Sequence, residues 1–296
     1  MRSLALILAL LTTAAAEPPK KPTPADVVDS APAADWREIP ANDLLVMTLE
    51  GGKQVVIQLA PAFAPVHVEN IRRMAGGGYW KGANVYRVQD NYVAQWGINE
   101  TKRAFPAGVM ALPPHEYWRS ASGLTVTPLG FPDPYAPKVG YADGWPVAVR
   151  ADGTANLTHC YGYVGVARDL APDTGSGGEL YAIIGHAPRG LDRNIAIVGR
   201  VISGIDQLSS LPRGTDKMGF YKEGQVARPI VSVQLASAMP SAERPRFEYL
   251  SDRSAAFGRL LKLRANRDDD FYRVPAGGVD LCSASVPVRS VPANRR

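Results

Sequence analysis

Short apolar runs separated by turn residues dominate the chain from Leu44 onward. The run 44–49, the turn Gly51-Gly52 and the run 55–59 together predict a β-hairpin. Strand-length runs of the same kind recur along the chain, at 84–88, 92–96, 162–167, 180–184, 195–201 and 229–236. Short strands at this density favour a sandwich or a barrel, and closure into a barrel removes exposed strand edges.

Helical spacing of apolar residues is limited to a few segments. One such segment begins at Pro65, which suits a first helical turn, and ends at the three glycines 76–78, so a helix is expected between them. A short helix is also expected over 205–211. Beyond Pro240, apolar residues within 247–263 recur at helical intervals among Arg and Asp. We expect this helix, part of a C-terminal extension over 239–296, to pack on the strand-rich core rather than on a membrane surface.

The first residues have the pattern of a secretory signal peptide. Arg2 supplies the positive start, an uninterrupted apolar run follows, and small residues at 14–16 offer a cleavage site. A bilayer-spanning helix needs about 20 apolar residues, whereas this run stops at Thr12. We therefore expect residues 1–16 to be removed, which leaves a periplasmic or secreted chain with no stable membrane insertion. The Pro- and Ala-rich residues 17–42 are predicted to be a disordered linker.

Composition narrows the class of protein. The 296 residues are 46% hydrophobic and 21% charged, which is typical of a globular chain. The formal net charge is +5, but Lys and Arg are scattered among acidic residues, so nucleic-acid binding is not supported. Residues 99–160 are irregular and rich in proline, and we interpret them as a long surface insertion in one domain over 43–238. No feature demands an oligomer, so we expect a monomer.

The most informative stretch covers residues 78–97. It reads Gly-Tyr-Trp-Lys-Gly-Ala-Asn-Val-Tyr-Arg-Val-Gln-Asp-Asn-Tyr-Val-Ala-Gln-Trp-Gly. This stretch resembles the signature of the cyclophilin-type peptidyl-prolyl cis–trans isomerases, in which an aromatic-Arg-Val strand, a turn and an aromatic-x-x-Gln-x-Gly strand follow Gly-Tyr-Tyr-x-Gly. Further segments match the family in the same order, at 55–70, 162–168, 174–183 and 191–201. The resemblance covers roughly 44–236 and implies a mainly β fold, a closed eight-stranded antiparallel barrel capped by two helices.

The resemblance also implies a function: the cis–trans isomerisation of X–Pro bonds in unfolded or Pro-containing polypeptides, which would assist the folding of extracytoplasmic proteins. The barrier to this rotation is about 18–20 kcal/mol, because the amide loses its resonance. A fixed cationic donor aimed at the prolyl nitrogen stabilises the twisted state more than the planar one. The reaction breaks no bond and needs no metal or cofactor, and none is expected here.

Site residues follow from the same resemblance, residue by residue. Arg87 is assigned as the cationic donor, and Gln95 as the residue that holds the substrate carbonyl. Four residues are assigned to the proline pocket: Tyr92, Val93, Tyr181 and Leu191. If strand alternation holds strictly, Arg87 and Val85 face one side of the strand, and Tyr86 and Val88 face the other.

The chain departs from the family pattern in and around the pocket. The departures are Tyr92 and Tyr181 in place of Phe, Val93 in place of Met, Glu179 in place of Gln, Arg168 in place of Asn, Gly190 in place of an aromatic residue and Ile195 in place of His. Glu179 can pair with Arg168 or draw Arg87 away from substrate. A second hypothesis is therefore a catalytically weak module of the same fold that binds Pro-containing partners.

Two cysteines, Cys160 and Cys282, lie far apart in the sequence. In an oxidising compartment such a pair can form one disulfide, and the alternative is two buried free thiols. The histidines at 67, 115 and 186 lack the spacing of metal ligands, so no metal site is expected.

Overall fold

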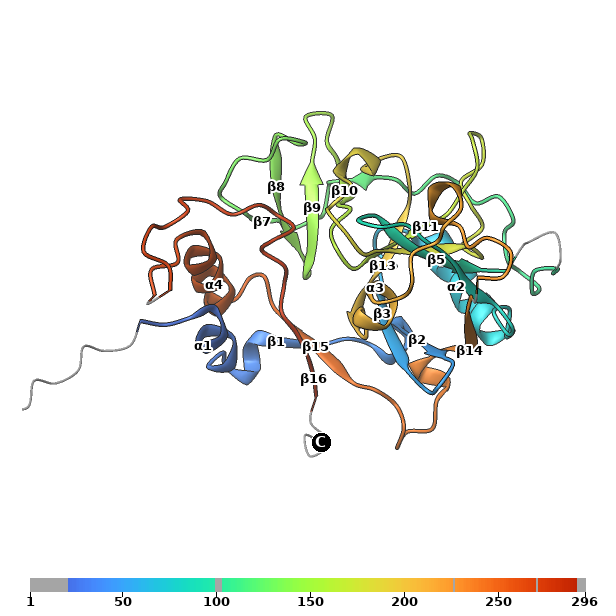
Figure 1. The fold of residues 1–296 in the computed structure, drawn as a ribbon. Coiled ribbons are helices and arrows are strands. Elements are labelled where there is room, and N and C mark those ends of the chain that lie inside the picture. The colour runs from blue at the N-terminus through green and yellow to red at the C-terminus, as the bar shows by residue number, and fades with distance from the viewer. Residues whose placement is uncertain (1–20, 99–102, 226, 270, 292–296) are drawn as a thin grey trace, which may run out of the picture.

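A closed antiparallel barrel of eight strands forms the main lobe of the protein (Figure 1). The computed structural model describes residues 21–98, 103–225, 227–269 and 271–291. The barrel strands are β2 (Leu44–Leu49), β3 (Gln54–Leu59), β4 (Asn84–Val88), β5 (Val93–Gly97), β11 (Tyr163–Val166), β12 (Leu180–Ile183), β13 (Ile197–Ser203) and β14 (Arg228–Leu235). Around the barrel they follow the order β11-β12-β5-β4-β14-β2-β3-β13. The predicted eight-stranded barrel is confirmed.

The first hairpin, β2 and β3, shows why these residues form strands. Leu45 lies opposite Ile57 and Met47 lies opposite Val55, and all four side chains are buried in the main core. The alternating side chains of β2 are buried as well, in a separate cluster that includes Ile39. Both faces of the hairpin are therefore covered, which explains why its strands are uninterrupted apolar runs.

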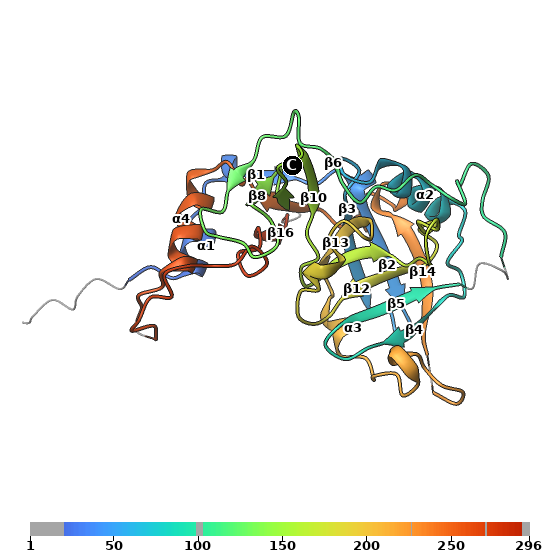
Figure 2. The same ribbon diagram turned by 90° about the horizontal axis from the view of Figure 1, so that it is seen from above.

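Two helices pack against the barrel, α2 (Pro65–Gly76) and α3 (Asp206–Ser209) (Figure 2). α2 buries its apolar face in the main core, as its spacing predicts. Its first turn is capped from the insertion, because the carboxylate of Glu116 accepts the backbone N–H groups of Val66 and His67. An acidic group at this end of a helix also complements the helix dipole.

The insertion contains a five-stranded antiparallel sheet, so its prediction as an irregular segment is wrong. The strands are β6 (Arg119–Ser120), β7 (Thr127–Pro128), β8 (Lys138–Ala142), β9 (Trp145–Val149) and β10 (Thr154–Leu157), in the order β6-β10-β9-β8-β7. The turns between the three longest strands contain Asp143-Gly144 and Asp152-Gly153. Asp-Gly is a strong signal for a tight hairpin turn. The density of prolines favours loops, but these turns and the apolar strands beside them outweigh it.

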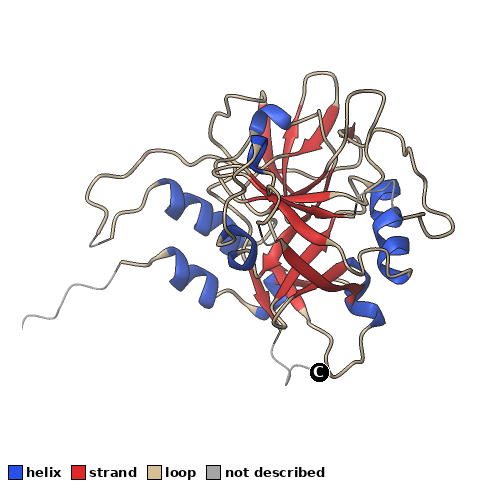
Figure 3. Ribbon diagram, turned by 45° about the vertical axis from the view of Figure 1, so that its right-hand side comes forward, coloured by secondary structure: helices blue, strands red, loops and turns tan. Residues whose placement is uncertain are grey.

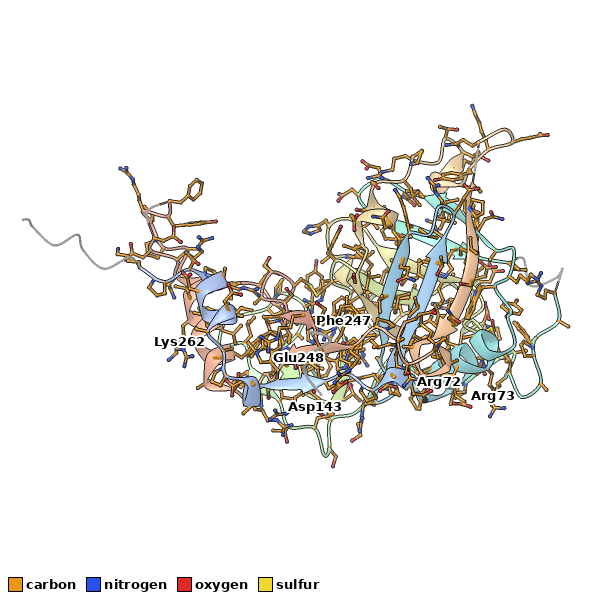
Figure 4. The ribbon with its side chains drawn as sticks, turned by 90° about the horizontal axis from the view of Figure 1, so that it is seen from below. Arg72, Arg73, Asp143, Phe247, Glu248 and Lys262 are labelled. Atoms are coloured by element: carbon orange, nitrogen blue, oxygen red, sulfur yellow. A yellow bond between two sulfur atoms is a disulfide. The ribbon has the colours of Figure 1, made fainter. Side chains whose placement is uncertain are left out.

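A second lobe joins this insertion to the start of the described chain and to the C-terminal extension (Figures 1 and 3). Its helices and strands outside the insertion are α1 (Pro24–Asp29), β1 (Trp36–Glu38), β15 (Phe247–Leu250), α4 (Ala255–Ala265) and β16 (Val288–Ser290). Short 3-10 turns occur along the whole described chain, at η1 (Ala33–Asp35), η2 (Ala41–Asp43), η4 (Arg189–Leu191), η5 (Lys217–Gly219) and η6 (Ala236–Ala238). β1, β15 and β16 form a three-stranded sheet in the order β1-β15-β16. Figure 4 labels Asp143, Phe247, Glu248 and Lys262 in this lobe, and Arg72 and Arg73 on α2 beside the barrel.

The prediction of a disordered linker over 17–42 is wrong for its described part. Thr23 caps the start of α1, and the side chain of Trp36 is buried in the core of the second lobe. Ile39 is buried against the outer face of the first hairpin. The Pro- and Ala-rich composition indicated disorder, but these apolar side chains find partners supplied by distant segments, which offset the entropy of ordering the chain.

The C-terminal extension also differs from its prediction as one helix on the barrel. Residues 247–250 form a strand that pairs with β1, and the helix begins only after Ser254, whose side chain accepts the N–H of Phe257. α4 packs on the insertion sheet, where the rings of Phe257 and Tyr141 lie edge to face with their centres 4.9 Å apart. The apolar spacing across 247–263 is therefore shared between a strand and a helix.

Cys160 and Cys282 form a disulfide, with their Cα atoms 5.1 Å apart, so the first of the two cysteine alternatives is confirmed. The bond ties the segment before β11 to the C-terminal extension. Among the described residues, no helix is long and apolar enough to cross a membrane. The predicted signal peptide over 1–16 lies outside the described residues.

Replacement of both cysteines by alanine should lower the free energy of unfolding by about 2–4 kcal/mol, because the disulfide closes a long loop in the unfolded chain. The two cysteines are 122 positions apart. Urea unfolding followed by tryptophan fluorescence measures the change. Reductant should destabilise the wild type to the same level and leave the double variant unaffected. Equal stability of the two proteins under oxidising conditions would contradict this expectation.

Candidate active site

An open cavity of about 980 Å³ lies on the barrel wall. Five residues that the sequence assigned to the site line it: Arg87, Tyr92, Val93, Gln95 and Tyr181. The sixth, Leu191, lies in η4 and is not among the lining residues, whereas Ile195 of the following segment is. The assigned residues come from three neighbouring barrel strands, β4, β5 and β12, and from the turn between β4 and β5.

Strand register places the central residues in one row. Arg87 of β4 lies opposite Gln95 of β5, and Gln95 lies opposite Tyr181 of β12. Tyr181 in turn lies opposite Gly165 of β11. Residues directly opposite each other in antiparallel strands project from the same face of the sheet, so this row converges on the cavity.

A β-bulge changes the direction of two side chains in β4. The register with β5 shifts between Val85 and Arg87. Val85 and Val88 are both fully buried in the main core, whereas Tyr86 and Arg87 both line the cavity. The prediction of strict alternation along this strand is therefore wrong, because a bulge inserts one extra residue and redirects the side chains beside it.

Three hydrogen bonds hold the guanidinium of Arg87. Its Nε donates to the carbonyl oxygen of Met218 at 2.8 Å, Nη1 donates to Oε1 of Gln95 at 2.9 Å, and Nη2 donates to Oε1 of Gln89 at 2.7 Å. A guanidinium carries five N–H donors, so within the described part of the chain one N–H on each Nη has no protein acceptor. Burial lowers the pKa of Arg87 from its ordinary value, but arginine stays cationic in proteins.

Aromatic rings flank this guanidinium. The ring centres of Phe220 and Tyr92 lie 5.2 and 5.8 Å from Cζ of Arg87. Phe220 also stacks on Tyr86, with ring centres 6.0 Å apart. Sequence reasoning missed Phe220 and Met218, because both reach the cavity from the segment before β14 and no local motif marks them. The rings restrict the orientation of the charge and contribute cation–π attraction.

A chain of hydrogen bonds continues from Gln95 to an acidic residue. Nε2 of Gln95 donates to the hydroxyl oxygen of Tyr86 at 2.6 Å, and that hydroxyl donates to Oε2 of Glu179 at 2.5 Å. Burial raises the pKa of Tyr86, and the neighbouring carboxylate of Glu179 raises it further, so the phenol stays protonated. The sequence suggests Arg168 or Arg87 as a partner of Glu179, and in the structure its carboxylate accepts from Tyr86. Arg168 donates to the backbone carbonyl of Asn194.

One wall of the cavity is apolar but contains a buried hydroxyl. Val93 and Tyr181 are 1% and 5% exposed. The hydroxyl of Tyr181 has no hydrogen-bond partner among the described residues, and burial raises its pKa. The end of its ring lies over Gly165, where an added Cβ would come within 2.3 Å of Cζ of Tyr181. A glycine at this position therefore makes room for the ring.

Comparisons with known proteins identify the family and the fold. A family model described as "Cyclophilin type peptidyl-prolyl cis-trans isomerase/CLD" matches residues 44–237. No curated protein matches the chain significantly. The crystal structure of cyclophilin AquaCyp293 from Hirschia baltica is 22% identical, with a TM-score of 0.70 over 91% of this chain and 98% of that one. A cyclophilin type isomerase from Cryptosporidium parvum, solved in the presence of the dipeptide Ala-Pro, is 13% identical, with a TM-score of 0.41 over 65% and 98% of the two chains. The likeness to AquaCyp293 shows a shared fold.

Replacement of Tyr181 by phenylalanine should raise the free energy of unfolding by about 1 kcal/mol, because it removes a buried hydroxyl that has lost its hydrogen bonds to water. Tyr141→Phe is the matched control. The hydroxyl of Tyr141 is also buried but donates to the carbonyl of Ala284 at 2.8 Å, so its removal should destabilise the protein by about 1–3 kcal/mol. Urea unfolding measures both changes, and a loss of stability in Tyr181→Phe would show that its hydroxyl is satisfied.

Proposed function

This chain belongs to the cyclophilin-type peptidyl-prolyl cis–trans isomerases, and we propose that it performs this reaction on Pro-containing polypeptides with Arg87 as the group that lowers the barrier. The observation that carries the proposal is the state of Arg87: a cation fixed by three hydrogen bonds, with unused donors at an open cavity.

The chemistry of the amide explains why such a cation accelerates the reaction. Rotation about the X–Pro bond costs about 18–20 kcal/mol because amide resonance is lost. In the twisted state the prolyl nitrogen has a free lone pair, which accepts a hydrogen bond that the planar amide cannot accept well. A donor held in place before the reaction stabilises the twisted state without having to reorganise. The remaining Nη protons of Arg87 suit this role.

The neighbouring residues suit the rest of the substrate. Gln95 uses one proton of its Nε2 on Tyr86, and we propose that the second proton holds the substrate carbonyl. Val93, Tyr92 and Tyr181 offer the apolar faces that would hold the pyrrolidine ring. Leu191, the fourth residue assigned to this pocket, does not line the cavity, so we propose that Ile195 contributes the wall in its place.

We further propose that the protein acts outside the cytoplasm, where it assists the folding of extracytoplasmic proteins. The signal-like pattern over 1–16 supports this location. The Cys160–Cys282 disulfide supports it independently, since structural disulfides persist mainly in oxidising compartments.

Arg87→Ala should lower kcat/KM by about 100- to 1,000-fold, the range measured when a fixed donor to a transition state is removed. A protease-coupled assay on an Ala-Pro peptide, with the chain from Glu17, measures the rate. Peptide affinity should change little, because the apolar wall is intact. Arg253→Ala, at a surface ion pair in the second lobe, should keep the wild-type rate. An unchanged rate in a folded Arg87→Ala protein would reject this role of Arg87, and an inactive wild type that still binds peptide would favour a binding module.

Expression of the full chain in a Gram-negative host should place the protein in the periplasm with Glu17 as its first residue, because the apolar segment is too short to remain as an anchor. Mass spectrometry of the intact protein from each cell fraction measures the cleavage. A chain that starts at residue 17 behind a new Met should stay in the cytoplasm. An intact Met1 in the membrane fraction would reject the cleaved signal.

A further inference from the structure

Two residues that line the cavity, Tyr86 and Glu179, complete a chain of hydrogen bonds that begins at Arg87. We propose that both are positioning residues for the isomerase reaction: they fix the side-chain amide of Gln95, and through it the guanidinium of Arg87. This inference rests on the proposed role of Arg87.

The chain of contacts is continuous and short. Arg87 donates to Gln95 at 2.9 Å, Gln95 donates to Tyr86 at 2.6 Å, and Tyr86 donates to Glu179 at 2.5 Å. It runs from a cation at one end to a carboxylate at the other. Hydrogen bonds arranged in series in this way polarise one another in a low-dielectric setting.

The chemistry of the two ends allows one arrangement of protons. An arginine donates and never accepts, and an ionised carboxylate accepts and never donates. Tyr86 must therefore donate to Glu179, and its oxygen is left to accept from Gln95. Gln95 must then present Nε2 to Tyr86 and Oε1 to Arg87. If the amide were rotated by half a turn, N–H would face N–H at Arg87 and oxygen would face oxygen at Tyr86.

Three local features of the fold bring these groups together. The bulge in β4 turns Tyr86 toward the cavity, and the ring of Phe220 stacks on it at 6.0 Å. Gly97, two positions after Gln95 in β5, leaves the space that the carboxylate of Glu179 occupies. A Cβ at Gly97 would lie 2.1 Å from Oε2 of Glu179. Any side chain at that position would displace the carboxylate from Tyr86.

Loss of one of these hydrogen bonds should disturb the orientation of Arg87 and should leave peptide binding intact. Without the Tyr86 hydroxyl, Nε2 of Gln95 loses its acceptor, and only the contact with Arg87 still favours the native orientation of the Gln95 amide. Arg87 would then spend part of its time out of line with the twisted bond. The apolar wall formed by Val93 and Tyr181 would be unaffected. The effect therefore falls on kcat more than on KM.

The test compares variants that remove the hydroxyl, the acceptor or only the charge. Tyr86→Phe and Glu179→Leu should each lower kcat about 10-fold with little change in KM, as loss of one hydrogen bond to a charged group predicts. Glu179→Gln should stay within about threefold of wild type, because its amide oxygen still accepts from Tyr86. The double variant Tyr86→Phe/Glu179→Leu should be no slower than either single variant, since both break one chain.

Two further measurements separate positioning from general damage. The side-chain amide signals of Gln95 in ¹⁵N NMR spectra should shift in Tyr86→Phe and stay near their wild-type positions in Glu179→Gln. Tyr221→Phe is the control, because the hydroxyl of Tyr221 donates to the carbonyl of Pro212 and takes no part in the hydrogen bonds between Arg87 and Glu179. This variant should keep the wild-type kcat. If Glu179→Leu does not fold, Tyr86→Phe and Glu179→Gln still form a complete comparison.

The outcomes distinguish this inference from the proposed function. If Arg87→Ala abolishes turnover but Tyr86→Phe keeps the wild-type kcat and an unshifted Gln95 amide, the positioning role is rejected and the role of Arg87 stands. If Glu179→Gln loses as much activity as Glu179→Leu, the acceptor role of Glu179 is rejected. If Arg87→Ala retains full activity, the proposed role of Arg87 fails first.

Discussion

The register of four neighbouring barrel strands is the constraint on which the candidate site depends. β4, β5, β12 and β11 pair so that Arg87, Gln95, Tyr181 and Gly165 form one row across the sheet. A slip of one residue in any of these strands would turn its side chains to the other face. The bulge in β4 adds Tyr86 to the same face. Backbone hydrogen bonds thus place the proposed catalytic charge and its supports before any substrate arrives.

The insertion packs on the barrel beside the site, because Trp145 and Val147 share a buried cluster with Val93 and Tyr181. Arg200 of β13 is buried and bridges the two parts: its Nε donates to Gln58 of the barrel, and its Nη1 donates to the carbonyl of Gly144 in the insertion. The ring of Trp145 lies 4.7 Å from the same guanidinium. The entropic cost of closing a loop grows slowly with its length, so a long insertion is tolerated where a sheet, a buried bridge and a disulfide return it to the barrel. The insertion thereby also covers part of the outer face of the strands that carry the site.

The sequence predicts those parts of the molecule whose signals are local. Gly51-Gly52 between two apolar runs predicts a hairpin, and the ordered motif around Arg87 and Gln95 predicts two paired strands and four lining residues of the cavity. The remaining features arise from contacts between distant segments. Trp36 lies in a Pro- and Ala-rich stretch and becomes part of a strand because β15 pairs with it. Phe220 reaches Arg87 from a loop with no motif of its own. The bulge in β4 has no sequence signature that periodicity can detect.

The positive charge of Arg87 explains why polar residues surround it in a site that otherwise has an apolar wall. A half-buried guanidinium loses hydration, and fixed acceptors must replace the lost water if the charge is to stay in place. Met218, Gln89 and Gln95 supply those acceptors. Gln95 is itself a neutral group that can rotate, so its own partners decide whether it is a rigid acceptor. Tyr86 and Glu179 end the chain in a negative charge, which balances the cation across a few ångströms of protein. On this view the tyrosine and the glutamate belong to the environment that keeps Arg87 aligned.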